Sequence, residues 1–297
     1  MRRVGAVRAP ALVLGLLLAV SPPAEAFSAR DMLGREVALA APPARIVSLV
    51  PSVTEVLFAL GAEARLVGVT DFCDYPPAAR GRPSVGGMVN PNLEVIVALR
   101  PDLVIATTEG NREETFTQLK RLGVPTYLVA AHRVSDVTDL IARLGALTGS
   151  QHAAAPLLRR LEQRVAAVTR AVAPLPHPRV LYVLWPEPLI VPGREALVTE
   201  LIRLAGGQSV TADEADAYPR LSLESAVARA PEVILLANHG ANTGPIDEER
   251  WRRLTSLPAV RAGRLHRVEG NLVHRYGPRV VDGLELLARA IHPEAFE

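Results

Sequence analysis

One segment of the chain occurs twice, and this repeat constrains the fold more than any other feature. Residues 92–105 and 222–235 align without a gap, with Leu, Glu, Val, Ala and Pro recurring at matching positions. Each copy starts with a helix-capping residue, Asn92 or Ser222, and its helical pattern breaks at a proline. An acidic residue and an apolar run follow. The repeat predicts two α/β lobes with one copy each. The alternative is a single α/β domain with a long insertion.

The region 43–149 has the pattern of one such lobe, the N-terminal lobe. Four short apolar runs predict buried strands, at 46–50, 66–69, 102–106 and 126–129. Helical segments between them, such as the one expected at 111–122, favour a parallel sheet. Ser52, with Glu55 three residues later, has the pattern of a capping box at the start of the first helix.

The middle of the chain is helical throughout. Apolar residues keep helical spacing from 134 to 172, and no strand pattern interrupts them. A proline-rich break at 173–178 ends this stretch. We therefore expect an α/β fold of two Rossmann-like lobes, with a single long bridging helix over 150–173. A C-terminal lobe over 178–297 and a ligand cleft between the lobes complete this expectation.

The first 26 residues have the pattern of a secretory signal peptide. Three arginines precede an apolar run at 11–20, and the small-x-small sequence Ala24-Glu25-Ala26 follows. The run is too short to span a bilayer comfortably, and no cysteine follows it for lipid attachment. We expect cleavage after Ala26, giving a periplasmic protein that begins at about Phe27.

Charge and motifs exclude several functions. The formal net charge of +2 equals the sum over the first 26 residues, so the remainder is neutral and gives no indication of nucleic-acid binding. The sequence contains no G-x-S-x-G, P-loop, G-x-G-x-x-G or H-E-x-x-H motif. Its seven histidines are scattered, so we expect no dedicated metal site. Cys73 is the only cysteine and is expected to be a spectator thiol. We expect no enzyme activity.

The candidate site residues follow predicted strands. Phe72, Tyr75, Trp185 and Tyr218 lie in loops, where ligands of α/β proteins bind. Each ring could equally plug its own loop. Arg275, before the last helix, could contact a polar group of a ligand.

The repeat also places Glu94 and Glu224 at equivalent positions, in the first turns of their helices. Complementing the helix dipole is sufficient reason for an acid there. The alternative is that the two lobes present matching negative knobs to a two-fold symmetric partner.

From Arg45 onward the chain resembles the periplasmic binding proteins for cobalamin, ferric siderophores and haem. The resemblance is carried by four segments: Arg45-Ile46-Val47-Ser48-Leu49-Val50-Pro51-Ser52-Val53-Thr54-Glu55, Asp74-Tyr75-Pro76-Pro77, residues 92–104, and Gly277-Pro278-Arg279-Val280-Val281-Asp282-Gly283. It implies two α/β lobes joined by one long helix. The Asp-Tyr-Pro-Pro stretch is most similar to the cobalamin binders of the family.

The resemblance implies roles for these residues. Glu94 and Glu224 would dock onto arginines of an ABC importer permease, which works with an ATPase. The corrinoid pocket of the family maps to Phe72, Met88, Ile190, Tyr218, Asn271 and Arg275. In the cobalamin binder these positions hold Tyr, Trp, Phe, Trp, Asp and Arg, so only Arg275 is unchanged.

These substitutions leave the ligand open. The expected function is a monomeric, periplasmic solute-binding protein that captures a corrinoid and holds no resident cofactor. A ferric siderophore or haem is the first alternative, and Tyr75, Tyr218 and His274 are candidate axial ligands for haem. A periplasmic enzyme on the same scaffold is the second. A long bridging helix predicts only small movement between the lobes.

Overall fold

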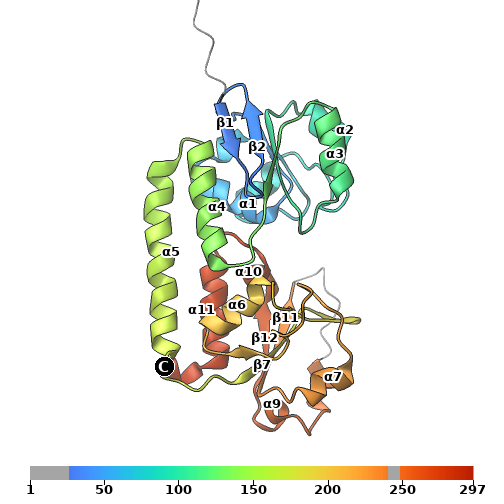
Figure 1. Ribbon diagram of the computed structural model, residues 1–297, viewed down its shortest axis with the longest axis vertical. Coiled ribbons are helices and arrows are strands. Elements are labelled where there is room, and N and C mark those ends of the chain that lie inside the picture. Colours follow the sequence, from blue (N-terminus) through green and yellow to red (C-terminus); the bar gives the residue numbers. More distant parts are fainter. Residues whose placement is uncertain (1–26, 240–247, 297) are drawn as a thin grey trace, which may run out of the picture.

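The computed structural model describes residues 27–239 and 248–296, which form two lobes connected by helices along one side (Figure 1). The expected signal peptide lies outside the described residues. Within them, no helix has the length and apolar character needed to cross a membrane.

The N-terminal lobe is built on a parallel sheet with strand order β4-β3-β5-β6. These strands are β3 (Ile46–Ser48), β4 (Leu66–Val69), β5 (Leu103–Thr107) and β6 (Thr126–Val129). Its helices are α1 (Pro51–Ala59), α2 (Leu93–Ala98) and α3 (Glu113–Arg121). An antiparallel hairpin of β1 (Phe27–Arg30) and β2 (Glu36–Leu39) precedes them.

The C-terminal lobe repeats this arrangement with the sheet order β10-β7-β11-β12, again parallel. Its strands are β7 (Arg179–Val183), β10 (Gln208–Ser209), β11 (Val233–Asn238) and β12 (Leu265–Glu269), with a small hairpin of β8 (Trp185–Pro186) and β9 (Leu189–Ile190). Its helices are α6 (Leu197–Leu204), α7 (Leu223–Ala228), α8 (Glu248–Arg252), α9 (Pro258–Arg261), α10 (Gly270–His274) and α11 (Val280–Ile291). In both sheets the lobe's first strand lies between its second and third, so the prediction of two α/β lobes is confirmed.

The two copies of the sequence repeat form the same local structure. Asn92 Oδ1 accepts a hydrogen bond from the N–H of Val95 at 3.1 Å, and Ser222 Oγ accepts one from Ser225 at 3.0 Å. Each helix then reaches a residue of positive φ directly before its proline, Arg100 at 46° and Ala230 at 44°. A residue before proline is disfavoured in the right-handed helical region, so each helix ends there.

The acidic residue after each proline accepts an equivalent hydrogen bond in both lobes. The carboxylate of Asp102 accepts from the N–H of Arg45 at 3.0 Å. Glu232 accepts from the N–H of Arg179 at 2.9 Å. In each lobe this bond ties the repeat to the start of the first parallel strand.

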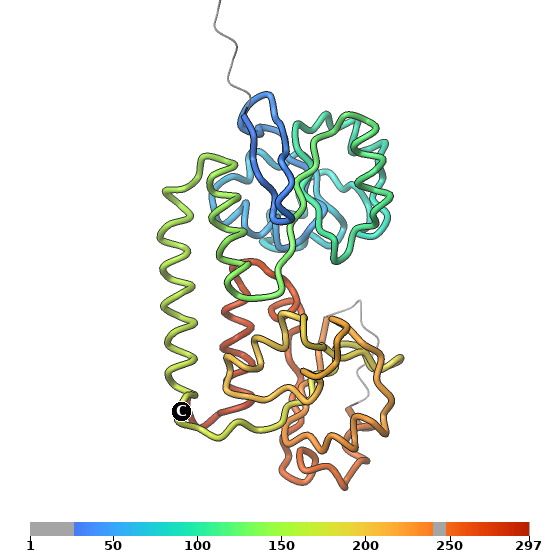
Figure 2. Tube along the Cα trace, viewed as in Figure 1, coloured from blue at the N-terminus to red at the C-terminus, as the bar shows by residue number. Residues whose placement is uncertain are grey.

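Two helices, α4 (Val134–Leu147) and α5 (Gln151–Val172), connect the lobes, and the chain runs down α5 from the upper lobe to β7 (Figure 1). Helix α5 occupies the stretch 150–173 in which the sequence predicts the bridging helix. The C-terminal helix α11 contacts α5 along this side (Figure 2). Arg164 of α5 joins them through ion pairs to Asp282 at 2.7 Å and Glu285 at 2.8 Å.

The largest apolar core is continuous through both lobes. It contains Ile46 and Leu140 of the N-terminal side, Leu161 of α5, and Ile202 and Leu284 of the C-terminal side. Because a close-packed core resists shear, this continuity holds the two lobes in one arrangement.

The expected capping box at the first helix is wrong. Helix α1 begins at Pro51 with Val50 as its N-cap residue, and no side chain caps it. Proline has the φ angle of a first helical residue and lacks the N–H that would need a partner, so it starts the helix before Ser52. Ser52 is 2% exposed and Glu55 is 3% exposed, and Glu55 faces the other lobe.

Candidate functional site

Four aromatic side chains on the two lobes are exposed although exposure of an apolar ring is unfavourable. They are Phe72 (45% exposed), Tyr75 (43%), Tyr218 (40%) and Trp185 (36%). The other eight of the twelve aromatic residues, all within the described ranges, are buried or half-buried. Exposed rings in loops that follow the strands of an α/β lobe are candidates for ligand contact. The four are the aromatic residues expected at the site from the sequence.

The N-terminal lobe places its candidates after the carboxyl ends of its strands. Phe72 and Tyr75 follow β4, and Met88 lies in the segment before α2. The backbone carbonyl of Met88 accepts a hydrogen bond from Asn111 Nδ2 at 2.6 Å, and Asn111 lies in the segment that follows β5. This bond holds the Met88 segment against the end of the sheet.

The C-terminal lobe also places its candidate residues after the carboxyl ends of its strands. Trp185 pairs with Ile190 across the β8–β9 hairpin, which follows β7, and Ile190 also bridges to Arg220. Asn271 lies in α10, where its N–H bonds to Glu269 Oε1 at 3.1 Å.

A cluster of rings surrounds His274 at this end of the C-terminal sheet. The His274 ring centroid lies 5.4 Å from that of Tyr182, 5.1 Å from His239 and 6.5 Å from Tyr218. The Tyr182 hydroxyl is hydrogen-bonded to His274 Nε2 at 2.9 Å. Burial, with the neighbouring His239, lowers the pKa of His274 to about 3, so this imidazole stays neutral at physiological pH. The imidazole ring that lies beside Tyr218 is therefore uncharged.

A carboxylate of the N-terminal lobe also acts electrostatically on Tyr218. Burial, together with the carboxylate of Glu109 in the N-terminal lobe, raises the pKa of the Tyr218 hydroxyl to about 12. Glu109 Oε1 lies 3.3 Å from His132 Nδ1. Burial raises the pKa of Glu109 itself. Sequence reasoning missed Glu109, because a single acid after a strand carries no distinguishing pattern.

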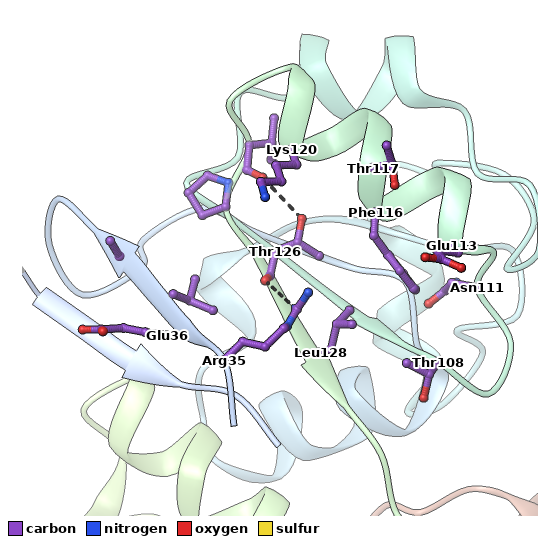
Figure 3. Close-up of a pocket in the computed structure, with 14 residues that line it drawn as sticks. Arg35, Glu36, Thr108, Asn111, Glu113, Phe116, Thr117, Lys120, Thr126 and Leu128 are labelled. Carbon is purple, nitrogen blue, oxygen red and sulfur yellow. Dashed lines mark hydrogen bonds between the residues drawn. The ribbon is translucent and has the colours of Figure 1, made fainter. Parts of the chain in front are cut away.

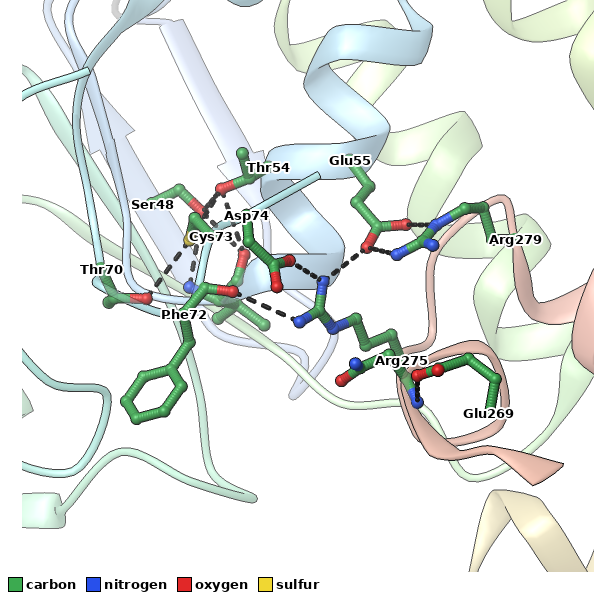
Figure 4. A network of polar contacts seen from close by, with 12 residues as sticks. Ser48, Thr54, Glu55, Thr70, Phe72, Cys73, Asp74, Glu269, Arg275 and Arg279 are labelled. Carbon is green, nitrogen blue, oxygen red and sulfur yellow. Dashed lines mark hydrogen bonds and ion pairs between the residues drawn. The ribbon is translucent and has the colours of Figure 1, made fainter. Parts of the chain in front are cut away.

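Arg275 is engaged in an interlobe clamp, which we define as Glu55, Asp74, Tyr75, Arg275 and Arg279. Figure 4 shows the four charged members. Arg275 Nη1 lies 3.1 Å from Glu55 Oε1 and 2.6 Å from Asp74 Oδ1. Arg279 contacts the same Glu55 carboxylate through Nε at 2.8 Å and Nη2 at 2.6 Å. The guanidinium carbon of Arg279 lies 3.7 Å from the centroid of the Tyr75 ring.

The clamp joins the lobes through two carboxylates and two guanidinium groups, of which Glu55 is the most buried and Asp74, at 40% exposed, the least. The Glu55 side chain is 2% exposed, and the two arginines are 13% and 20% exposed. Burial favours the neutral form of Asp74, but the hydrogen bond and charge of Arg275 outweigh it and lower the pKa of this carboxyl. Arg275 Nη2 also donates to the backbone carbonyl of Phe72 at 3.4 Å, which fixes the loop carrying this exposed ring.

Six of the eight expected ligand-site residues thus form three local groups in the described structure, and Met88 and Asn271 belong to none of them. Phe72, Tyr75 and Arg275 meet at the clamp, Tyr218 meets His274, and Trp185 meets Ile190. Sequence reasoning missed Glu55, which had been interpreted as part of a capping box, and Asp74. Their partners are more than 200 residues away in the chain.

Glu94 and Glu224 are exposed in the first turns of α2 and α7. Both helices lie on the side of the lobes opposite α5 (Figure 1). Hydrogen bonds from its own backbone N–H and from Ser222 lower the pKa of Glu224, so it is ionised at neutral pH. The two glutamates therefore present one negative charge per lobe.

A separate hollow of about 760 Å³ lies in the N-terminal lobe between the β1–β2 hairpin and α3 (Figure 3). Arg35, Lys120 and Phe116 are among its lining residues, and none of the expected site residues lines it. Within the ranges 27–239 and 248–296, no group of three or more His, Cys, Asp or Glu side chains is arranged to hold a metal ion.

Comparisons with known proteins give a consistent result. Residues 46–271 match the family described as "Periplasmic binding protein". The vitamin B12-binding protein of Salmonella typhi is 31% identical over 247 residues, which cover 83% of this chain and 90% of that protein. The crystal structure of the periplasmic vitamin B12 binding protein BtuF of Vibrio cholerae superposes with a TM-score of 0.77 at 27% identity, covering 86% of this chain and 99% of that one. A periplasmic haem-binding protein from Pseudomonas aeruginosa gives a TM-score of 0.76 at 28% identity, covering 84% and 93%.

Proposed function

The chain belongs to the periplasmic binding protein family, and we propose that it captures a corrinoid such as cobalamin and delivers it to the permease of an ABC importer. Proteins of this family are solute carriers rather than enzymes, and the transported ligand is a cargo rather than a resident cofactor. The cleavage after Ala26, the ATPase partner and a monomeric state are parts of this proposal.

The observation that carries the proposal is the set of exposed rings on both lobes. Phe72 and Tyr75 on one lobe, with Tyr218 and Trp185 on the other, offer apolar faces for a large ligand. Neutral His274 supports Tyr218 without adding charge. Rings with large apolar faces suit a bulky, partly apolar chelate better than a small charged solute.

The equivalence of Glu94 and Glu224 supports a docking role for the two glutamates. They occupy matching positions in the repeat, on the same side of the molecule, and both are exposed. Two like charges related by an approximate two-fold arrangement suit a partner with two matching arginine sockets. A permease of this symmetry would then receive the ligand from between the lobes.

Haem is the second candidate, favoured by the similarity to haem-binding proteins. One of its three expected axial ligands is engaged, because His274 Nε2 is bonded to the Tyr182 hydroxyl. Arg279 lies against the face of the Tyr75 ring, and this contact does not involve the phenol oxygen that would ligate iron. Tyr75 and Tyr218 are therefore the candidate axial ligands, so a haem complex predicts loss of a tyrosinate-type absorption spectrum in Tyr75→Phe or in Tyr218→Phe.

The test is calorimetric titration of the mature protein with cyanocobalamin, a cobinamide, haem and a ferric siderophore. Binding of either corrinoid at micromolar or tighter affinity, weakened at least tenfold in Phe72→Ala and Tyr218→Ala, would support the proposal. Leu122→Ala is the matched control, because Leu122 is 53% exposed and lies after α3. Binding of an iron chelate alone would show that the protein serves an importer of that chelate, and it would overturn the corrinoid assignment.

A further inference from the structure

The β1–β2 hairpin lies outside the part of the chain that the proposed function uses. It ends at Leu39, before residue 46, where the family match begins, and it carries none of the expected site residues. Its turn covers the outer edge of β6. The N–H of Met32 donates to the Leu128 carbonyl at 3.1 Å, and Asp31 Oδ2 accepts from the Leu128 N–H at 3.3 Å. The hairpin thereby closes one edge of the N-terminal sheet.

The hairpin leaves an edge of its own open. Among the described strands, β2 pairs with β1 alone. The N–H of Asp31 bonds to the Arg35 carbonyl at 2.9 Å, and hydrogen-bonded pairs alternate with non-bonded pairs along an antiparallel ladder. Glu36 and Ala38 therefore occupy non-bonded positions, and their N–H and C=O groups point away from β1. None of these backbone groups forms a hydrogen bond with another described residue.

The hollow of about 760 Å³ adjoins this open edge (Figure 3). Residues 35–38 line it and residues 27–30 do not, so it lies on the β2 side of the hairpin. Its base is formed by residues of β6. The face of α3 that lines it has helical spacing and consists of Glu113, Phe116, Thr117 and Lys120. Neighbouring strands lie about 4.8 Å apart, so the hollow offers space for an extended segment beside β2.

The charges at the hollow favour a basic segment. Arg35 is matched by the carboxylate of Asp31, which lies 2.7 Å away. Glu36, Glu113 and Lys120 also line the hollow, and none of them forms an ion pair within the described part of the chain. Two carboxylates thus lie beside one ammonium group. A segment with positive charge is therefore complementary to this surface.

The burial of β2 predicts the pattern of such a segment. Val37 and Leu39 are buried, whereas Glu36 and Ala38 are exposed. Cross-strand neighbours share a face of the sheet, so a strand beside β2 would carry the same alternation of apolar and polar residues.

We propose that the open edge of β2 is a strand-addition site for an extended segment of a partner protein in which apolar and basic residues alternate. The main-chain groups of Glu36 and Ala38 bind the segment, and the carboxylates of Glu36 and Glu113 select its charge. This surface is separate from the exposed rings and does not rest on the proposed function.

The test measures the binding of an end-blocked, fluorescein-labelled hexapeptide of alternating valine and lysine by fluorescence anisotropy. Ala38→Pro removes one outward N–H and spares the pairing with β1, because that N–H is not bonded to β1. Its affinity for the peptide should fall about tenfold. The matched control is Ser28→Pro. Ser28 pairs with Ala38, but its N–H points out of the opposite edge of the hairpin, so the affinity should stay unchanged.

Two further measurements test the place and the charge of the segment. Bound peptide should protect the amides of residues 36–39 from hydrogen exchange. Glu36→Gln should weaken binding of the lysine peptide, and a peptide of alternating valine and glutamate should bind the wild type more weakly than the lysine peptide does.

Three results would overturn the proposal. They are the absence of saturable binding of the lysine peptide at about 1 mM, equal affinities of Ala38→Pro and Ser28→Pro, and equal affinities of the wild type for the two peptides. Self-association of the wild type that Ala38→Pro abolishes, measured by analytical ultracentrifugation, would show that a second copy of the chain occupies the edge instead. Ala38→Pro should bind cyanocobalamin as the wild type does, so failure of the edge site leaves the proposed function standing.

Discussion

Replacing Glu55 by Gln should be one of the most destabilising conservative changes in this protein. Glu55 is the one carboxylate that both clamp arginines share, and its side chain is 2% exposed. Removing one partner of a buried ion pair costs about 3–5 kcal/mol. Arg275 keeps Asp74, and both arginines retain some contact with water, so we expect the lower end, about 3 kcal/mol. This corresponds to a drop in melting temperature of about 6–10 °C.

The assay is urea unfolding of the mature protein, followed by circular dichroism. The midpoint should fall at an unchanged slope, because the same surface is exposed on unfolding. Asp139→Asn is the matched control: its partner Arg143 lies 2.6 Å away, but the two side chains are 46% and 36% exposed. An exposed pair of this kind contributes under about 0.5 kcal/mol. Equal losses in the two variants would show that the clamp is no stronger than a surface ion pair and would refute the reasoning.

Three further changes test the assignments. Charge reversal of Glu94 and Glu224 together should abolish ligand uptake in cells and leave affinity in solution intact; weakened binding in solution would refute a pure docking role. The folded-state pKa of Asp74 is lowered, so its contribution to stability is present above about pH 4 and is lost as the pH falls further, and Asp74→Asn should flatten this acid limb in urea titrations. If Arg275 acts through the clamp, Arg275→Ala should weaken ligand affinity no more than Glu55→Gln does; a distinctly larger loss by calorimetry would show direct ligand contact.

The sequence predicts the architecture well because its signals there are local. The repeat contains a cap, a helix, a proline and a strand in a fixed order, and each of these acts on its own neighbours. Arg100 and Ala230 adopt the same positive φ before proline, which is the structural counterpart of the repeated pattern. Two copies of one unit then yield two sheets of the same strand order.

The clamp could not be predicted by the same reasoning. Ser52 and Glu55 have the spacing of a capping box, and spacing alone cannot show that Pro51 starts the helix earlier. The partners of Glu55 lie 220 and 224 residues further along the chain. Such pairing depends on how the lobes pack, which follows from the continuous core around α4, α5 and α11 rather than from any local pattern.

Arg275 is a residue for which the sequence and the structure each indicate a different role. The family resemblance marks it as the one pocket position that is unchanged, and this alone suggests a ligand contact. The structure gives it a further task, since it joins Glu55 to Asp74 and holds the carbonyl of Phe72. Loss of Arg275 would therefore remove one of the two arginines that join the lobes at Glu55, and it would release the loop that carries an exposed ring. Aromatic positions can change with the shape of a ligand, whereas this arginine also joins the two lobes through Glu55 and Asp74, and that contact does not depend on the ligand.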